Sequence, residues 1–146
     1  MIYTENTKKA MKIAYKAHNG QMDKGGVPYI YHPMHIAERM DDELSTVVAL
    51  LHDVIEDTFI SYNDLKNDQI SQEAIEIIKI LTRNKDEDYF EYINRVGKNS
   101  IARKIKIEDL IHNSDLTRLD VIDEKSLKRV EKYNKALKIL NNINNN

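Results

Sequence analysis

The sequence has no cysteine and no tryptophan, and only four glycines and two prolines among its 146 residues. The absence of cysteine excludes thiol catalysis, thiolate metal sites and disulfide bonds, and it fits a reducing cytoplasm. So few chain breakers favour long helices. No apolar run approaches the roughly 20 residues that a spanning helix needs, and lysines interrupt the apolar residues of the first segment. We therefore expect no signal peptide and no membrane partner.

The charge of the chain is divided unevenly along its length. Residues 41–91 hold fourteen acidic and four basic residues, whereas residues 92–146 hold twelve basic and seven acidic ones. Such an acidic stretch is either a set of solvated helix faces or a source of carboxylates for a cation, with flanking basic segments that meet an anion. No dense stripe of Lys and Arg is present, so neither DNA nor RNA is an expected partner.

Apolar spacing predicts an all-α fold of one domain over residues 1–140, packed around a central buried helix at 43–55 that is apolar nearly all round. Glycine and proline make residues 20–31 a loop, and Pro33 suits the first turn of a short helix through Met40. Residues 124–140 form the closing helix, and the Asn-rich residues 141–146 are expected to fray. The other helices are expected to begin at Thr4, Ser61, Ser71, Asp86 and Ser100.

A His-Asp pair ends the most apolar helix, within Leu50-Leu51-His52-Asp53-Val54-Ile55-Glu56-Asp57. Helical geometry separates His52 and Asp53 by about 100°, so both can flank one ion at the helix end. Glu56 and Asp57 follow four residues after His52 and Asp53 and lie over the same edge. Buried together, these groups would be costly unless a cation neutralised the carboxylates. Taken alone, the segment is equally well a hydrophilic helix terminus.

Two other segments supply matching donors. His32 precedes Pro33 where the loop meets the second helix, and Asp109 lies on a helix otherwise lined with Ile and Leu, with Asn113 one turn further on. Singly, His32 reads as a capping residue and Asp109 as a solvent-facing charge. Together with His52 and Asp53 they make a site of two histidines and two aspartates from three separate helix ends.

Three motifs, GQ-x2-K-x3-PYI-x-HP, LLHDVIED and KIEDLIHNSDL, resemble in order and spacing the HD-domain hydrolases of the RelA/SpoT type, and above all their small stand-alone alarmone hydrolases. The resemblance covers residues 8–140. It implies an all-α enzyme that binds one divalent metal ion, typically Mn²⁺, and removes the 3′-diphosphate of guanosine tetra- or pentaphosphate (ppGpp and pppGpp). It further implies that the metal ligands are His32, His52, Asp53 and Asp109. The carboxylates that activate water would be Glu56 and Asp57, and the substrate-binding residues would include Asn113, Arg129 and Tyr133.

These residue types suit the chemistry. Imidazoles and carboxylates bind Mn²⁺, Fe²⁺ or Zn²⁺, with Mg²⁺ as a further candidate, and the absence of thiolates argues against a structural zinc site. Such a metal lowers the pKa of water and polarises a phosphoryl oxygen, while Glu56 or Asp57 takes the proton. An anionic nucleotide also needs cations beside the metal, for which Lys24, Lys85 and Arg129 are the candidates.

One position departs from the family pattern. Asp23 stands where related sequences carry an arginine that stacks on guanine, and an aspartate could instead accept hydrogen bonds from the N1 and N2 edge of that base. Of the other histidines, His18 is expected to order the first loop. His35 is expected at the surface rather than behind the metal ligands, and His112 is expected to face away from the metal.

Three functions therefore stay open. The leading one is a cytoplasmic, metal-dependent hydrolase of guanosine tetraphosphate, active as a monomer or homodimer. The second is an HD phosphatase of another nucleotide, such as a mononucleotide or a 2′-phosphorylated dinucleotide, which Asp23 favours. The third is a nucleotide sensor with little turnover, against which Glu56 and Asp57 argue, because a sensor needs no water-activating carboxylate.

Overall fold

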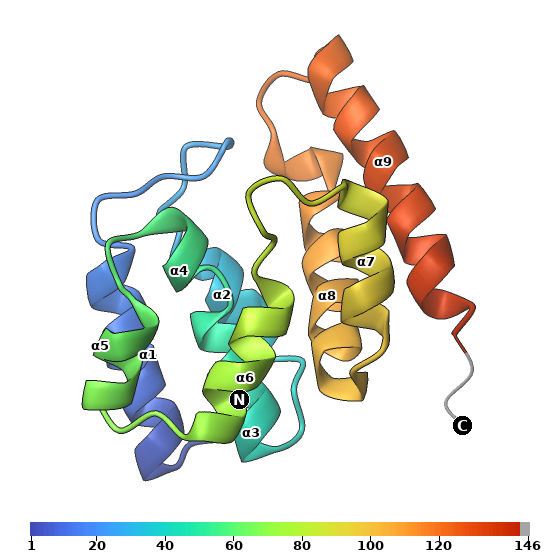
Figure 1. The fold of residues 1–146 in the computed structure, drawn as a ribbon. Coiled ribbons are helices and arrows are strands. Elements are labelled where there is room, and N and C mark those ends of the chain that lie inside the picture. Colours follow the sequence, from blue (N-terminus) through green and yellow to red (C-terminus); the bar gives the residue numbers. More distant parts are fainter. Residues whose placement is uncertain (144–146) are drawn as a thin grey trace.

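A computed structural model describes residues 1–143. The regular secondary structure of these residues is helical, apart from one isolated antiparallel bridge between Met22 and Pro28. Within the described residues, no helix is long and apolar enough to cross a membrane. The elements follow one another along the chain (Figure 1) as α1 (Glu5–Ala17), α2 (Tyr31–Ala37), α3 (Glu43–Leu51), α4 (Val54–Asp57), α5 (Tyr62–Asn67), α6 (Gln72–Leu81), α7 (Tyr89–Gly97), α8 (Ser100–Asn113), the 3₁₀ turn η1 (Leu116–Arg118) and α9 (Glu124–Asn141).

Side-chain caps fix where most of the helices begin. The hydroxyl of Thr4 accepts a hydrogen bond from the Thr7 amide at the start of α1, and Ser61 and Ser71 do the same for α5 and α6. Such caps satisfy amides that the first helical turn leaves unpaired. These three starts are as predicted from the sequence.

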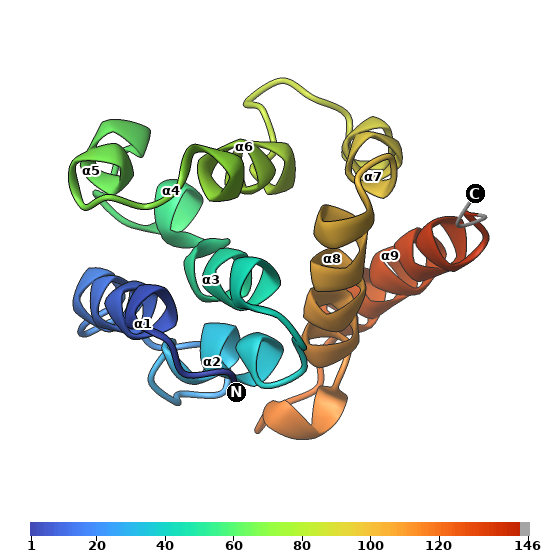
Figure 2. The ribbon, with the colours of Figure 1, turned by 90° about the horizontal axis from the view of Figure 1, so that it is seen from below.

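The helix α3 is the centre of the core. Every residue from Ser45 to Leu51 is buried. The helix α3 packs against α1, α2 and α6, and it makes a smaller contact with α8. Figure 2 shows α3 between the pair α1 and α2 on one side and α6 on the other, with α8 beside it and α7 and α9 beyond. The prediction of an all-α fold around a buried helix is confirmed.

The central helix is shorter than the sequence predicts. It ends at Leu51 instead of residue 55, and α4 begins again only at Val54. Asp53, with φ of −105° and ψ of −4°, stays in the right-handed region but differs from ideal α-helical angles. The Nδ1 atom of His52 bonds to the carbonyl oxygen of Ala49, so a side chain takes the place of the backbone amide that would continue the helix. The chain therefore turns at the His-Asp pair and directs α4 away from the axis of α3.

Smaller differences concern the helix ends. The second helix spans Tyr31–Ala37 rather than ending at Met40. The start expected at Asp86 lies at Tyr89, because the Asp88 carboxylate accepts hydrogen bonds from the amides of Phe90 and Glu91. Asn99 rather than Ser100 caps α8, and α9 continues one residue further than predicted, to Asn141. Of the tail expected to fray, residues 144–146 lie outside the described residues.

Candidate metal centre

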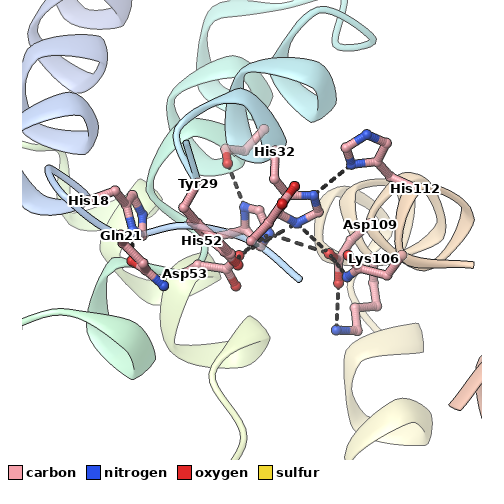
Figure 3. A network of polar contacts seen from close by, with 12 residues as sticks. His18, Gln21, Tyr29, His32, His52, Asp53, Lys106, Asp109 and His112 are labelled. Atoms are coloured by element: carbon pink, nitrogen blue, oxygen red, sulfur yellow. Dashed lines mark hydrogen bonds and ion pairs between the residues drawn. The ribbon is translucent and has the colours of Figure 1, made fainter. Parts of the chain in front are cut away.

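Four ligand atoms converge where α2, the end of α3 and α8 meet. The His32 Nε2 atom lies 2.9 Å from Asp109 Oδ1 and 3.6 Å from Asp53 Oδ2, and His52 Nε2 lies 3.1 Å from Asp53 Oδ2 and 3.6 Å from Asp109 Oδ1. Figure 3 shows the four side chains directed at one another. The structure thus brings together the two histidines and two aspartates that the sequence singles out.

The two carboxylates of this cluster are held in their charged form. Burial alone would raise the pKa of Asp109, but the Lys106 ammonium and the contact with His32 hold it well below its usual range. Burial opposes ionisation of Asp53 too, yet the neighbouring His52 lowers the pKa of that carboxyl. Both aspartates therefore present negative oxygens, which are the hard ligands that divalent cations prefer.

The histidines also fit a divalent ion. The Nδ1 atom of His52 lies 2.6 Å from the Ala49 carbonyl oxygen, to which it can only donate, so the neutral ring carries its lone pair on Nε2. That Nε2 atom is buried and makes no hydrogen bond of good geometry, although Asp53 is near. Burial disfavours charge on the ring, but Asp53 and Asp109 raise the pKa of His52 well above its usual value. A proton and a cation therefore compete for one lone pair, and a metal ion would satisfy the orphaned atom.

His112 lies behind His32 instead of facing away from the centre. The Nδ1 atoms of the two rings are 2.7 Å apart, so a proton on His32 Nδ1 is donated to His112 and leaves His32 Nε2 free to bind a metal. Burial first, and then Arg118, lower the pKa of His112 to about 3, so the ring is neutral and accepts at Nδ1 in the tautomer that carries its proton on Nε2. His35 stacks on the His112 ring at 3.8 Å between centroids, so it belongs to this group rather than to the open surface.

We expect the substitution His112→Phe to weaken metal binding. It keeps a ring against His35 but removes the acceptor that fixes the tautomer and orientation of His32, and loss of such a supporting partner typically costs 10–100-fold in metal affinity. Calorimetric titration with Mn²⁺ measures the effect. His35→Phe is the matched control, because that ring contacts no ligand atom. Equal affinities in wild type and His112→Phe would contradict the role of His112.

Three further side chains hold the aspartates in place, and two of them, Tyr29 and Lys106, were not singled out by the sequence analysis. The Tyr29 hydroxyl donates to Asp53 Oδ2 at 2.6 Å. On α8, the Lys106 ammonium donates to Asp109 Oδ2 at 2.7 Å, which leaves Oδ1 to face the histidines. Asn113, expected at the edge of the metal, donates from Nδ2 to Asp109 Oδ1 at 2.9 Å. Lys106 precedes Asp109 by three residues and so shares its helix face, a signal that was available in the sequence.

Glu56 and Asp57 stand at the opening of this centre, on the short helix α4. Both are solvent-exposed, yet the surrounding protein raises the pKa of each carboxyl, with the charge of Asp53 as a further cause. Glu56 is fixed in place because its Oε1 atom accepts a hydrogen bond from the Arg83 amide at 2.6 Å. A carboxyl whose pKa is raised towards neutrality is a better proton acceptor for water than an ordinary one.

A pocket of about 500 Å³ opens over the centre, a volume that accommodates a nucleotide. Its wall is formed by the first loop, the metal centre, η1 and α9. It includes most of the substrate-binding residues expected from the sequence, namely Lys24, Asn113, Arg129 and Tyr133. Lys85 is different: it is exposed in the turn before α7 and lines none of the pockets described, whereas Arg83, two residues earlier, does line one.

The carboxylate of Asp23 is occupied within the protein. Its Oδ1 atom accepts hydrogen bonds from the amides of Gly25 and Val27, and its Oδ2 atom pairs with Arg118 Nη2 at 3.1 Å. A Cβ on Gly25 would collide with the Arg118 carbonyl oxygen, so a glycine is needed for this approach. Asp23 thus folds the loop and holds it against η1, and Arg118 adds a guanidinium to the pocket wall. His18 binds the Gln21 side chain and orders the same loop.

Several curated proteins are similar to this chain over most of its length. No protein-family model matches the chain. It is 30% identical over 140 residues to the guanosine-3′,5′-bis(diphosphate) 3′-pyrophosphohydrolase of Borreliella burgdorferi, covering 85% of this chain and 20% of that protein. It is 31% identical over 120 residues to the bifunctional (p)ppGpp synthase/hydrolase SpoT of Escherichia coli K12, covering 73% and 17%. It is 28% identical over 141 residues to the GTP pyrophosphokinase of Myxococcus xanthus, covering 84% and 18%.

The chain spans about a fifth of the length of these curated relatives. Its fold matches a solved structure of a metazoan orthologue of SpoT that hydrolyses ppGpp, with a TM-score of 0.80 and 23% identity, over 100% of this chain and 91% of that one. With sequence similarity over most of its length and the same fold over all of it, this chain belongs to the HD-domain proteins of the RelA/SpoT type.

Proposed function

We propose that the chain is a metal-dependent hydrolase that removes the 3′-diphosphate of guanosine tetra- or pentaphosphate. The observation that carries the proposal is the convergence of two imidazoles and two ionised carboxylates, whose aspartates Asp53 and Asp109 line a pocket that also holds several Lys and Arg side chains. Relatives described as 3′-pyrophosphohydrolases support this substrate. The proposal includes Mn²⁺ as the ion, a small anionic nucleotide rather than DNA or RNA as the partner, action in the cytoplasm, and a monomer or homodimer.

His32, His52 and Asp109, whose ligand atoms all lie within 4.8 Å of one another, would hold the ion together with Asp53, which lies beside both histidines. When bound, the ion supplies Lewis-acid stabilisation of charge on the phosphoryl oxygens. Glu56 and Asp57 orient a water molecule against the phosphorus that carries the ribose O3′, and one of them accepts its proton. The new bond joins the water oxygen to phosphorus, the bond from phosphorus to O3′ breaks, and O3′ takes up a proton. The products are a nucleotide with a free 3′-hydroxyl and inorganic diphosphate. Arg129, Tyr133 and Lys24 orient the nucleotide from the pocket wall.

A panel of nucleotides with Mn²⁺ tests the proposal. We expect release of inorganic diphosphate from guanosine tetraphosphate, with GDP as the second product, and no release after chelation of the metal. Release of phosphate from mononucleotides or from a 2′-phosphorylated dinucleotide alone would instead favour the alternative phosphatase. Tight binding of the tetraphosphate without release would favour a sensor. Separation of the products by ion-exchange chromatography distinguishes the three outcomes.

A further inference from the structure

A second, smaller pocket adjoins the metal centre on the side away from the first loop. It has a volume of about 210 Å³, and it shares Glu56, Lys106, Asp109, Asn113 and Tyr133 with the larger pocket. Its remaining wall comes from Arg83 between α6 and α7, from Tyr89 and Tyr92 of α7, from Leu110 of α8 and from Lys132 of α9, and none of residues 21–25 takes part. A ligand centred on the metal ligands can therefore extend into two different spaces.

This small pocket has an excess of positive charge. Arg83, Lys106 and Lys132 line it, and only Lys106 has a carboxylate partner among the described residues, namely Asp109. The Arg83 side chain is anchored through Nε to the Glu87 carbonyl oxygen at 2.9 Å, an acceptor without net charge. The Lys132 ammonium lies 4.4 Å from the centre of the Tyr89 ring. Burial, and then the nearby charges led by Arg83 and Lys106, lower the pKa of Lys132, as expected where cations are crowded together.

Tyr89 adds an unsatisfied donor to the same wall. Its hydroxyl oxygen is buried without a hydrogen-bond partner, which costs free energy unless a ligand supplies an acceptor. Burial raises the pKa of Tyr89 to about 12, so the hydroxyl keeps its proton and can donate it. Two cations without an ion-pair partner among the described residues, together with one free donor, describe a site for an anion with several acceptor oxygens.

We propose that this pocket is a diphosphate subsite. It binds the outer phosphate of the 3′-diphosphate while the inner phosphorus lies at the metal centre, and it retains inorganic diphosphate after the bond to O3′ has broken. The inference rests on the proposed function. It assigns to Arg83, Lys132 and Tyr89 the recognition of the group that is removed, and it leaves the nucleoside and its 5′-phosphates to the larger pocket.

Binding of inorganic diphosphate to the Mn²⁺-loaded protein tests the subsite without any need for turnover. We expect Arg83→Ala and Lys132→Ala each to raise the Kd for inorganic diphosphate about 10-fold or more, since each removes a charged partner, and Tyr89→Phe to raise it about 3- to 10-fold. Titration calorimetry at a fixed concentration of free Mn²⁺ measures these values. Lys138→Ala is the matched control, because this exposed lysine lies on the same helix and lines neither pocket.

GDP serves as the second probe and decides which phosphates the pocket binds. Unchanged affinity for GDP, together with weakened binding of inorganic diphosphate, supports the subsite. Weakened binding of GDP alone would overturn it, because the pocket would then hold the 5′-phosphates, and so would unchanged binding of both probes. If the chain failed to hydrolyse guanosine tetraphosphate, the proposed function would fall, but the difference between Lys132→Ala and Lys138→Ala in diphosphate binding would still be measurable.

Discussion

Substitution of Asp53 by alanine is expected to abolish metal binding and turnover together. Asp53 Oδ2 lies between the Nε2 atoms of His52 and His32, at 3.1 and 3.6 Å, so it is a shared member of the ligand cluster. Without it, one negative charge and one donor disappear from a site that must neutralise a divalent ion. The Lewis-acid contribution of a bound metal is several kcal/mol, so turnover should fall by about 10³-fold or more.

Two measurements on Asp53→Ala give the answer: elemental analysis after dialysis for metal content, and diphosphate release for turnover. Asp86→Ala is the control, because Asp86 is exposed in the turn before α7 and its substitution removes the same charge. Circular dichroism shows whether both variants remain helical. A folded Asp53→Ala protein with full metal content and full activity would show that Asp53 is not a ligand.

Glu56→Gln is expected to lower turnover by at least ~10²-fold while metal content and fold are retained. The glutamine can still accept the hydrogen bond from the Arg83 amide through its side-chain oxygen, so the contact between α4 and the following segment survives. What it loses is the capacity to take a proton from water. Rapid-mixing or steady-state assays at saturating Mn²⁺ measure the change.

The pH profile adds a readout that a structural role would not alter. Desolvation by the surrounding protein raises the pKa of Glu56, so during acidification the wild-type enzyme loses this base at a higher pH than it would lose an ordinary glutamate. The wild-type rate should fall as the pH drops through that raised pKa, and the residual rate of Glu56→Gln should lack this component. Glu73→Gln, an exposed substitution in the first turn of α6, is the control. A rate for Glu56→Gln close to that of wild type would remove its catalytic role.

The fold was largely predictable because its information is local. Capping residues such as Thr4 and Ser61 and the apolar faces behind them determine most of the helices. The end of α3 was not predictable from apolar periodicity, which continues through Val54 and Ile55. The chain turns there because His52 binds the Ala49 carbonyl oxygen, a contact that depends on the side chain's orientation.

The candidate site, too, was predictable from the sequence only in part. The sequence motifs identify the four residues that converge and that we propose as metal ligands, since their types and order are distinctive. The supporting contacts could not be predicted in this way. They depend on how α2 packs against α3 and α8, which brings Tyr29 to Asp53 and places His112 behind His32. Asp23 shows the limit most clearly, because its sequence position suggests a contact with the base, whereas the structure uses its carboxylate to fold the loop and to bind Arg118.

The four proposed ligand residues would also couple the ion to the stability of the whole molecule. His32 belongs to α2, His52 and Asp53 follow α3, and Asp109 belongs to α8, a helix that packs directly on α7 and α9. A cation held by all four joins segments 77 residues apart in sequence, and the unfolded chain offers no such preformed arrangement. Its binding free energy therefore adds to the free energy of unfolding, by about 1.4 kcal/mol for each tenfold excess of free metal over the dissociation constant. Scarcity of the ion would thus lower the folded population as well as the catalytic rate.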